Sequence, residues 1–141
     1  MIVLHTNVLS ELMRARPDDA VVAWADARAP DQLLTTANTV ADILHGIARL
    51  PDGRRKSALH EAAIETFADD FAGRILVFDE LAAEQYAELV SARERSGQPI
   101  SMADAQIAAI CRCQDAPLLA TRNLKDFRGL GINLINPWEA A

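Results

Sequence analysis

Three aspartates stand where carboxylates could meet to do chemistry. Asp42 and Asp104 open two helical stretches, and Asp126 follows an apolar run that ends at Thr121. Hard divalent cations such as Mg²⁺ prefer oxygen ligands, which a few carboxylates and water supply. Cations held in this way activate a water molecule and stabilise the charge on a scissile phosphate. A cluster of these residues would therefore suit metal-assisted phosphodiester cleavage.

Two of these aspartates also have a plain structural explanation. Thr39-x-x-Asp42 and Ser101-x-x-Asp104 both look like capping boxes, with the hydroxyl capping the helix and the acid reaching back. The helix dipole also favours an acid in the first turn. Taken singly, each aspartate is more often structural than catalytic, so the chemistry depends on whether the fold brings them together.

The elements that would position these residues are short apolar runs separated by longer helical patterns. Apolar runs without alternation fit strands covered on both faces, here residues 2–4, 32–36, 74–78, 117–121 and 132–136. Helical periodicity predicts helices over residues 7–15, 18–28, 39–50, 54–71, 81–95 and 101–114. This alternation predicts an α/β fold, a three-layer α/β/α sandwich with a mostly parallel central sheet.

The functional crevice of such a sheet lies beyond the carboxyl ends of its strands, at a switch point of the topology. His5, Thr6 and Asn7 follow the first strand run, and Arg122 and Asn123 follow the fourth. We therefore expect them at the same edge as the aspartates. Arg122 could touch phosphate there, although a strand-end arginine is more often simply solvated.

Length and composition indicate one ordinary globular domain spanning residues 1–141. The net charge of −6 argues against a protein that holds nucleic acid by a general basic field. It does not exclude a nuclease, because carboxylates loaded with a divalent cation present a locally positive site. Aromatic residues are only 5% of the chain, which disfavours recognition by stacked bases, so we interpret Trp24, Phe71 and Phe78 as core residues.

No apolar run approaches the roughly 20 residues needed to cross a bilayer. The opening Met1-Ile2-Val3-Leu4 is too short for a signal peptide and has no basic residues before it, so we expect a cytoplasmic protein. Cys111 and Cys113 lie two apart, which is neither a zinc nor a redox spacing. We expect free thiols, with Cys111 buried.

Four ordered motifs and the end of the sequence carry a family resemblance. Residues 1–11 read MIVLHTNVLSE, residues 39–47 read TVADILHGI, residues 101–109 read SMADAQIAA, residues 119–123 read LATRN and residues 135–138 read INPW. This order resembles the PIN-domain family, specifically its VapC- and FitB-like toxin ribonucleases, whose motifs are D-T-N-V-x-S-E, T-V-A-E-x-x-x-G, S-x-x-D-x-x-I-A-A and A-T-R-[ND]. The resemblance covers essentially the whole chain.

The resemblance implies a homodimer that hydrolyses single-stranded RNA with Mg²⁺ or Mn²⁺, and a cognate antitoxin that binds the toxin. It implies catalytic roles at the positions of His5, Asp42, Asp104 and Asn123, the first three as metal ligands. By the same resemblance, supporting roles fall on Thr6, Asn7, Ser101, Arg122 and Asp126, with Asn7 orienting the first acid.

The sequence departs from this pattern at two metal positions. The family's first acid is Asp, but His5 stands here, and its second is usually Glu, but here it is Asp42. Asp104 is intact, and Asn123 fills a position that is an acid or Asn in the family, with Asp126 a turn further on as a substitute. Mg²⁺ accepts an imidazole poorly, although Mn²⁺ or Zn²⁺ could still use it. We therefore predict weak or absent Mg²⁺-dependent activity for this chain.

Two other interpretations of the sequence remain open. One is a non-catalytic PIN-fold module that binds an antitoxin or RNA without cutting, and His5 favours it. The other is an unrelated small α/β enzyme, for which we find no nucleophile elbow, phosphate-binding glycine loop or dinucleotide fingerprint.

Overall fold

The computed structural model describes residues 1–140 of the chain. Its strands are β1 (Ile2–Leu4), β2 (Leu33–Thr36), β3 (Ile75–Leu76), β4 (Leu118–Ala120) and β5 (Asn133–Ile135). Its α-helices are α1 (Thr6–Leu12), α2 (Asp19–Asp26), α3 (Ala37–Ala48), α4 (Arg54–Glu65), α5 (Glu80–Arg95), α6 (Met102–Arg112) and α7 (Leu124–Phe127). A short 3₁₀ helix, η1 (Pro30–Gln32), precedes β2, and a π-helical segment, η2 (Thr66–Asp70), continues α4.

The five strands form one sheet in the order β3-β2-β1-β4-β5, and every pair of neighbours runs parallel. The predicted α/β class with a parallel sheet is confirmed. The chain places β2 and β3 on one side of β1 and then returns to place β4 and β5 on the other. The topology therefore reverses between β1 and β4.

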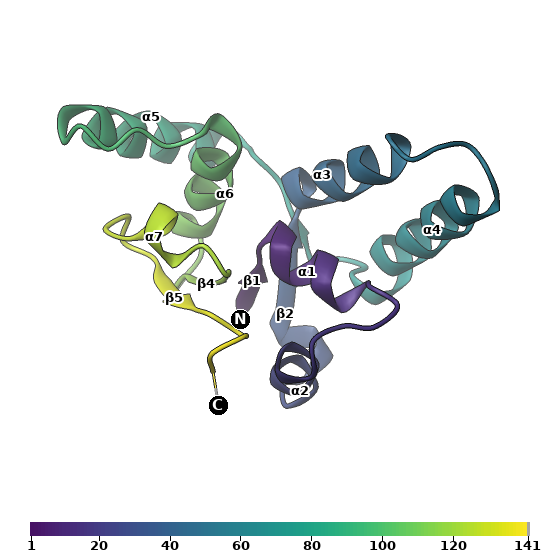
Figure 1. The fold of residues 1–141 in the computed structure, drawn as a ribbon. Helices are drawn as coiled ribbons and strands as arrows, with labels where there is room; N and C mark the ends of the chain where they lie inside the picture. The colour runs from purple at the N-terminus through teal and green to yellow at the C-terminus, as the bar shows by residue number, and fades with distance from the viewer. Residues whose placement is uncertain (141) are drawn as a thin grey trace.

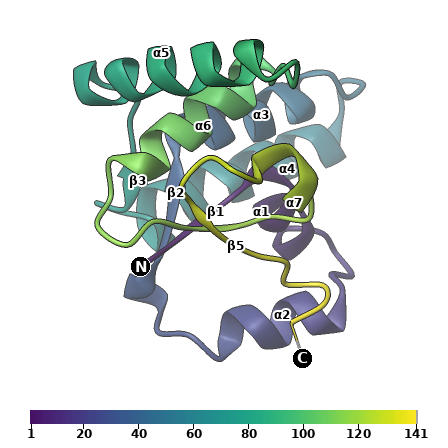
Figure 2. The same ribbon diagram turned by 90° about the vertical axis from the view of Figure 1, so that its left-hand side faces the viewer.

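Helices cover both faces of this sheet, with α5 and α6 on one side and α1 to α4 on the other (Figure 1). Figure 2 brings the first side to the front, where α6 lies across the strands. Successive residues of β1 serve the two layers in turn: Val3 packs with α6 residues such as Ile107, while Ile2 and Leu4 pack with Val8 of α1. Alternation of side chains along a strand lets one short segment anchor both layers.

The third strand is shorter than the sequence predicts. Residues 74–78 were expected to be strand, but β3 contains only Ile75 and Leu76. The prediction that Phe78 is a core residue is wrong for this reason: it lies beyond the strand, is 36% exposed and packs edge-on against Tyr86. Trp24 and Phe71 are buried as predicted.

The other elements follow the predicted order with small shifts of their ends. The helix expected over residues 54–71 ends at Glu65 and continues as η2. The short α7 was not predicted, because its four residues are too few to show a helical period.

Both cysteines are free thiols, as expected, with Cys111 buried and Cys113 exposed. Burial raises the pKa of the Cys111 thiol to about 12. Across residues 1–140, none of the helices has the length and apolar character that a membrane crossing requires.

Candidate active site

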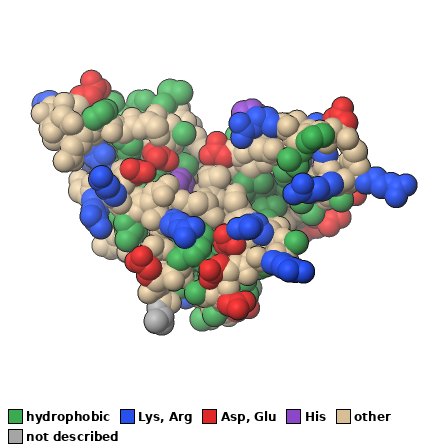
Figure 3. Space-filling view, in the orientation of Figure 1, with side chains coloured by type: hydrophobic (Ala, Val, Ile, Leu, Met, Phe, Trp, Pro, Cys, Tyr) green, Lys and Arg blue, Asp and Glu red, His purple; other side chains and the backbone are tan. Residues whose placement is uncertain are grey.

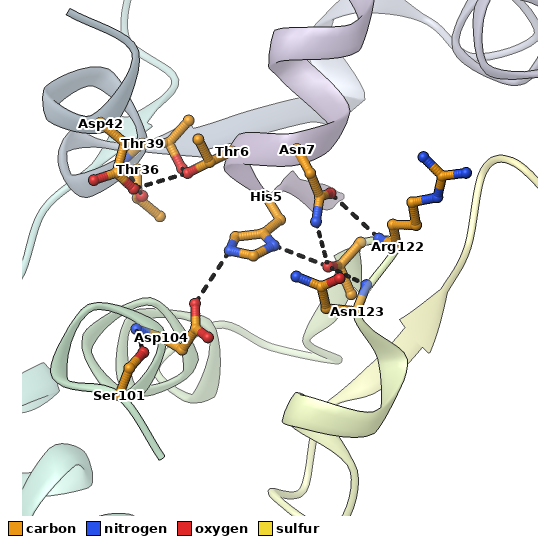
Figure 4. Close-up of polar contacts among 11 residues, drawn as sticks. His5, Thr6, Asn7, Thr36, Thr39, Asp42, Ser101, Asp104, Arg122 and Asn123 are labelled. Carbon is orange, nitrogen blue, oxygen red and sulfur yellow. Dashed lines mark hydrogen bonds and ion pairs between the residues drawn. The ribbon is translucent and has the colours of Figure 1, made fainter. Parts of the chain in front are cut away.

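The switch point between β1 and β4 brings together residues from three distant parts of the chain. His5 follows β1, Thr121 follows β4, and Asp104 stands in the first turn of α6. Figure 4 shows His5 between Asp104 on one side and the segment after β4 on the other. The sequence predicts polar residues at this edge of the sheet, and the side chains of His5, Asn7 and Asp104 lie there.

His5 is buried and held at both ring nitrogens. Only 6% of the residue is exposed. Its Nδ1 lies 2.8 Å from the hydroxyl oxygen of Thr121, and its Nε2 lies 3.3 Å from Oδ1 of Asp104. The ring of Phe127 packs edge-on against it, with 5.1 Å between ring centroids. His5 therefore makes its polar contacts within the protein and exposes little surface to a substrate.

Asp104 combines a place in the helix cap with a partner across the site. Ser101 caps α6, and its hydroxyl oxygen accepts a hydrogen bond from the Asp104 amide at 3.2 Å, as the capping pattern predicts. The Asp104 carboxylate, however, is directed at His5 (Figure 4). The hydrogen bond from His5 lowers the pKa of Asp104 below its usual value, and partial burial opposes this shift.

Asp42 belongs to a second, separate group (Figure 4). The Thr6 hydroxyl donates to Oδ2 of Asp42 at 3.0 Å and lies 3.1 Å from the Thr39 hydroxyl. The interpretation of Thr39 as the cap of this helix is wrong by one turn. Thr36, at the extended end of β2, is the cap, because its hydroxyl oxygen accepts the Thr39 amide at 3.1 Å. Thr39 is instead fully buried behind Thr6.

Asn7, Arg122 and Asn123 meet around Thr121. The side chain of Asn7 donates to the Thr121 hydroxyl at 3.3 Å and accepts the Arg122 amide at 3.2 Å. The Asn123 amide also donates to Thr121, at 3.1 Å. Asn7 thus holds the segment after β4. The Arg122 guanidinium stacks on Trp138 at 4.7 Å from the ring centroid.

Asp126 lies on α7 at the edge of the same region. It lines a small cavity of about 160 Å³ together with Asp104, Ser101 and the buried Arg93. Its backbone carbonyl accepts a hydrogen bond from Arg93 at 2.8 Å. The structure therefore brings Asp126 near Asp104, and leaves Asp42 with Thr6.

Sequence reasoning missed Thr121, Thr39 and Phe127 as parts of this site. Thr121 stood inside a quoted motif directly after a predicted strand, so its place at the switch point was a usable signal. Thr39 was interpreted only as a cap. Phe127 gave no signal, because its contact with His5 depends on α7.

This donor set does not fit the Mg²⁺ or Mn²⁺ that the resemblance implies. An imidazole stands where the first carboxylate is expected, and Asp104 and Asp42 are engaged with His5 and Thr6. Among the residues that the structure describes, no group of three or more His, Cys, Asp or Glu side chains could hold a metal ion. We therefore assign no reaction step to a bound cation in this chain.

A larger groove of about 650 Å³ opens beside Asp42, between α1, α3 and α4. Apolar side chains such as Met13, Ile43 and Ile47 line it. The side chains of Arg14, Arg16 and Arg55 also line the groove. Figure 3 shows basic side chains around an apolar hollow on this part of the surface.

Comparison with known proteins gives full-length matches. A family model described as PIN domain matches residues 2–132. The chain is similar to a VapC ribonuclease of Sinorhizobium fredii, with 41% identity over 141 residues and 100% of both chains covered. It is similar to the toxin FitB of Neisseria gonorrhoeae, with 40% identity over 139 residues and 99% of each chain covered. The crystal structure of FitAcB from Neisseria gonorrhoeae superposes with a TM-score of 0.91 at 40% identity, covering 99% of both chains.

Proposed function

Because the chain belongs to the PIN-domain family, as a VapC- and FitB-like member, we propose that it is an endoribonuclease toxin that hydrolyses RNA phosphodiester bonds. The observation that carries the proposal is the 41% identity to a VapC ribonuclease over the entire length of both proteins. The polar residues at the switch point between β1 and β4 support it, since this is where a parallel α/β sheet carries its functional site.

We further propose that this chain is impaired as an enzyme at position 5. His5 supplies no anionic oxygen, and its ring is turned toward Asp104 and Thr121. Asp42 is also one methylene shorter than the family's Glu, so its carboxylate reaches about 1.5 Å less far, one bond length. Both changes weaken a carboxylate cluster that would act on phosphate.

The decisive experiment compares the unmodified chain with the double variant His5→Asp, Asp42→Glu on a mixed RNA substrate, in Mg²⁺, Mn²⁺ or EDTA. We expect the double variant to cut faster by at least about tenfold, equivalent to about 1.4 kcal/mol of barrier. EDTA should abolish this activity. Adding Asp104→Asn to the double variant is the matched control and should remove the gain.

Two outcomes would contradict the proposal in different ways. A folded double variant that cuts no RNA would oppose the ribonuclease assignment. An unmodified chain that cuts as fast as the double variant would leave that assignment intact and overturn the impairment. Circular dichroism of each variant separates loss of chemistry from loss of fold.

A non-catalytic binding module is the second candidate function. The contact between His5 and Asp104 favours it, because it occupies groups that the resemblance assigns to catalysis. A folded double variant that binds RNA or an antitoxin without cutting would support this function over the first.

We propose a cognate antitoxin as the partner and the groove beside Asp42 as its docking site. The floor is apolar and includes Ile47 and Leu59, while Arg14, Arg16 and Arg55 supply positive charge. A segment with apolar residues on one face and acidic residues at its margins would match both features. Its docking beside Asp42 would also cover that carboxylate.

The resemblance further implies a homodimer, which we propose for this chain. Three large apolar side chains are more than half exposed: Val77, which follows β3, and Leu81 and Met102, in the first turns of α5 and α6. Exposed apolar side chains of this kind are available for contact with a second copy.

A further inference from the structure

A chain of hydrogen bonds connects the ends of β1 and β4 to Asp104, and Thr121 is its centre. The Thr121 side chain is fully buried, and its hydroxyl oxygen lies close to three groups: Nδ2 of Asn7 at 3.3 Å, the Asn123 amide nitrogen at 3.1 Å and Nδ1 of His5 at 2.8 Å. A hydroxyl can donate one hydrogen bond and accept two. The direction of each bond can therefore be assigned.

Two backbone amides fix these directions, because a backbone N–H only donates. The Arg122 amide faces the Asn7 side chain and can only donate to it, so Oδ1 of Asn7 must lie on that side and the amino group of Asn7 must donate to Thr121. The Asn123 amide donates to the same hydroxyl oxygen. Both lone pairs of Thr121 are thereby occupied, and its proton is left to donate to Nδ1 of His5 (Figure 4).

The tautomer of His5 follows from this assignment. Since Nδ1 accepts from Thr121, the ring proton sits on Nε2, which faces Oδ1 of Asp104 at 3.3 Å. The opposite assignment would aim a third donor at an oxygen with two lone pairs. It would also leave the buried Thr121 proton without an acceptor, which structures rarely tolerate.

We propose that Thr121, His5 and Asp104 form a fixed hydrogen-bond chain that replaces a divalent cation at this site and prevents His5 from binding one. In this arrangement neither ring nitrogen has a free lone pair: Nδ1 accepts a hydrogen bond from Thr121, and Nε2 carries the hydrogen that points to the Asp104 carboxylate. On this proposal, and against the expectation from the sequence, neither Mn²⁺ nor Zn²⁺ should bind His5. The proposal goes beyond the proposed ribonuclease function and stands whether or not the chain cuts RNA.

The chain of bonds also explains how the site holds together without a cation. An aspartate at position 5 would face the Asp104 carboxylate and would need a positive charge between them. The imidazole instead donates a hydrogen bond to Asp104 and receives one from the β4 side. We therefore expect the fold of this chain to be indifferent to divalent cations.

The first test records the ring nitrogens of His5 by ¹⁵N NMR on the unmodified protein. A protonated ring nitrogen and a bare one have well-separated shifts, and the His5 signals are identified by their loss in His5→Asn. We expect a protonated Nε2 and a bare Nδ1 near neutral pH, unchanged when Mg²⁺ or Zn²⁺ is added. A protonated Nδ1, or a His5 signal that moves on addition of Zn²⁺, would overturn the proposal.

A matched pair of variants tests the role of Thr121. Thr121→Ser keeps the hydroxyl, and we expect it to keep the same pattern of His5 signals. Thr121→Val removes the hydroxyl at similar volume, and we expect the fraction with a protonated Nε2 to fall. Equal patterns in the two folded variants would mean that Thr121 does not set the tautomer.

The second test measures thermal unfolding of the unmodified chain, His5→Asp and His5→Asn in Mn²⁺ and in EDTA. We expect the melting temperature to rise by several degrees with Mn²⁺ only in His5→Asp, since a ligand that binds the folded state stabilises it. His5→Asn is the control, because it adds no carboxylate. An equal rise in the unmodified chain would overturn the proposal, and because no RNA is present, this result is independent of any ribonuclease activity.

Discussion

At the scale of single residues, the Asp104 carboxylate ties the stability of the fold to pH. Its pKa is lowered from 3.8, chiefly by the hydrogen bond from His5, so the folded state favours the ionised form. Well above pH 3.8 this stabilisation is complete, because Asp104 is ionised in both states. As the pH falls below 3.8, the unfolded chain takes up the proton first, and stability is lost until the folded-state pKa is passed.

We therefore predict that Asp104→Asn flattens the fall in the free energy of unfolding on the acid side of pH 3.8. Urea unfolding at a series of pH values measures this slope. The exposed Asp69 gives a matched control, and Asp69→Asn should leave the slope as it is in the unmodified chain. A slope unchanged by Asp104→Asn would remove the Asp104 carboxylate from the acid sensitivity of the fold.

The residues of the site were predictable as types and positions, but their partners were not. His5, Asn7, Asp104 and Asn123 were singled out from motifs at strand ends and helix starts, and they lie around one edge of the sheet. The pairing of His5 with Asp104 joins residues from opposite halves of the chain. No local pattern encodes such a contact, because it depends on how β1 and α6 pack. The contact between His5 and Thr121 was unpredictable for the same reason, although the place of Thr121 after a strand was not.

At the scale of elements, one hydroxyl connects the end of β2 to the start of α3. Thr36 ends the strand and caps the helix through the Thr39 amide. We predict that Thr36→Val, which removes the hydroxyl at similar volume, destabilises the fold by about 1 kcal/mol, the usual effect of losing an N-cap. Thr36→Ser keeps the cap and is the control. Amide hydrogen exchange at Thr39 should quicken in the valine variant alone, and equal protection in both would refute the cap.

The sequence predicts elements well where their pattern is long and poorly where it is short. Strand β1 matches the prediction residue for residue, because Ile2, Val3 and Leu4 are all apolar and all buried. The third strand was predicted too long, over residues 74–78, because Val77 and Phe78 are as apolar as residues of a buried strand. Its pairing with β2 ends at Leu76. Strand length depends on the neighbouring strand, which a local pattern does not contain.

At the scale of the whole molecule, we expect the groove beside Asp42 to determine which antitoxin the protein binds. We predict that Ile47→Asp weakens binding of the cognate antitoxin by at least about tenfold, or about 1.4 kcal/mol, because it puts a charge into the apolar floor. Titration calorimetry measures the affinity. Ile64→Asp makes the same change on α4 at a side chain that is 44% exposed and does not line the groove, so binding should be unaffected. Equal losses in both variants would argue against the groove as the docking site.

The central position of β1 also sets the order in which the site can form as the chain is synthesised. Strand β1 can pair with β2 early, but its other edge waits for β4, which begins at Leu118. His5 and Thr121 are separated by 116 positions, so the hydrogen bond between them is among the last contacts available to a growing chain. A chain that stopped short of Leu118 would leave β1 with one bare edge and would lack Thr121. The site therefore assembles only after nearly the whole sequence has been made.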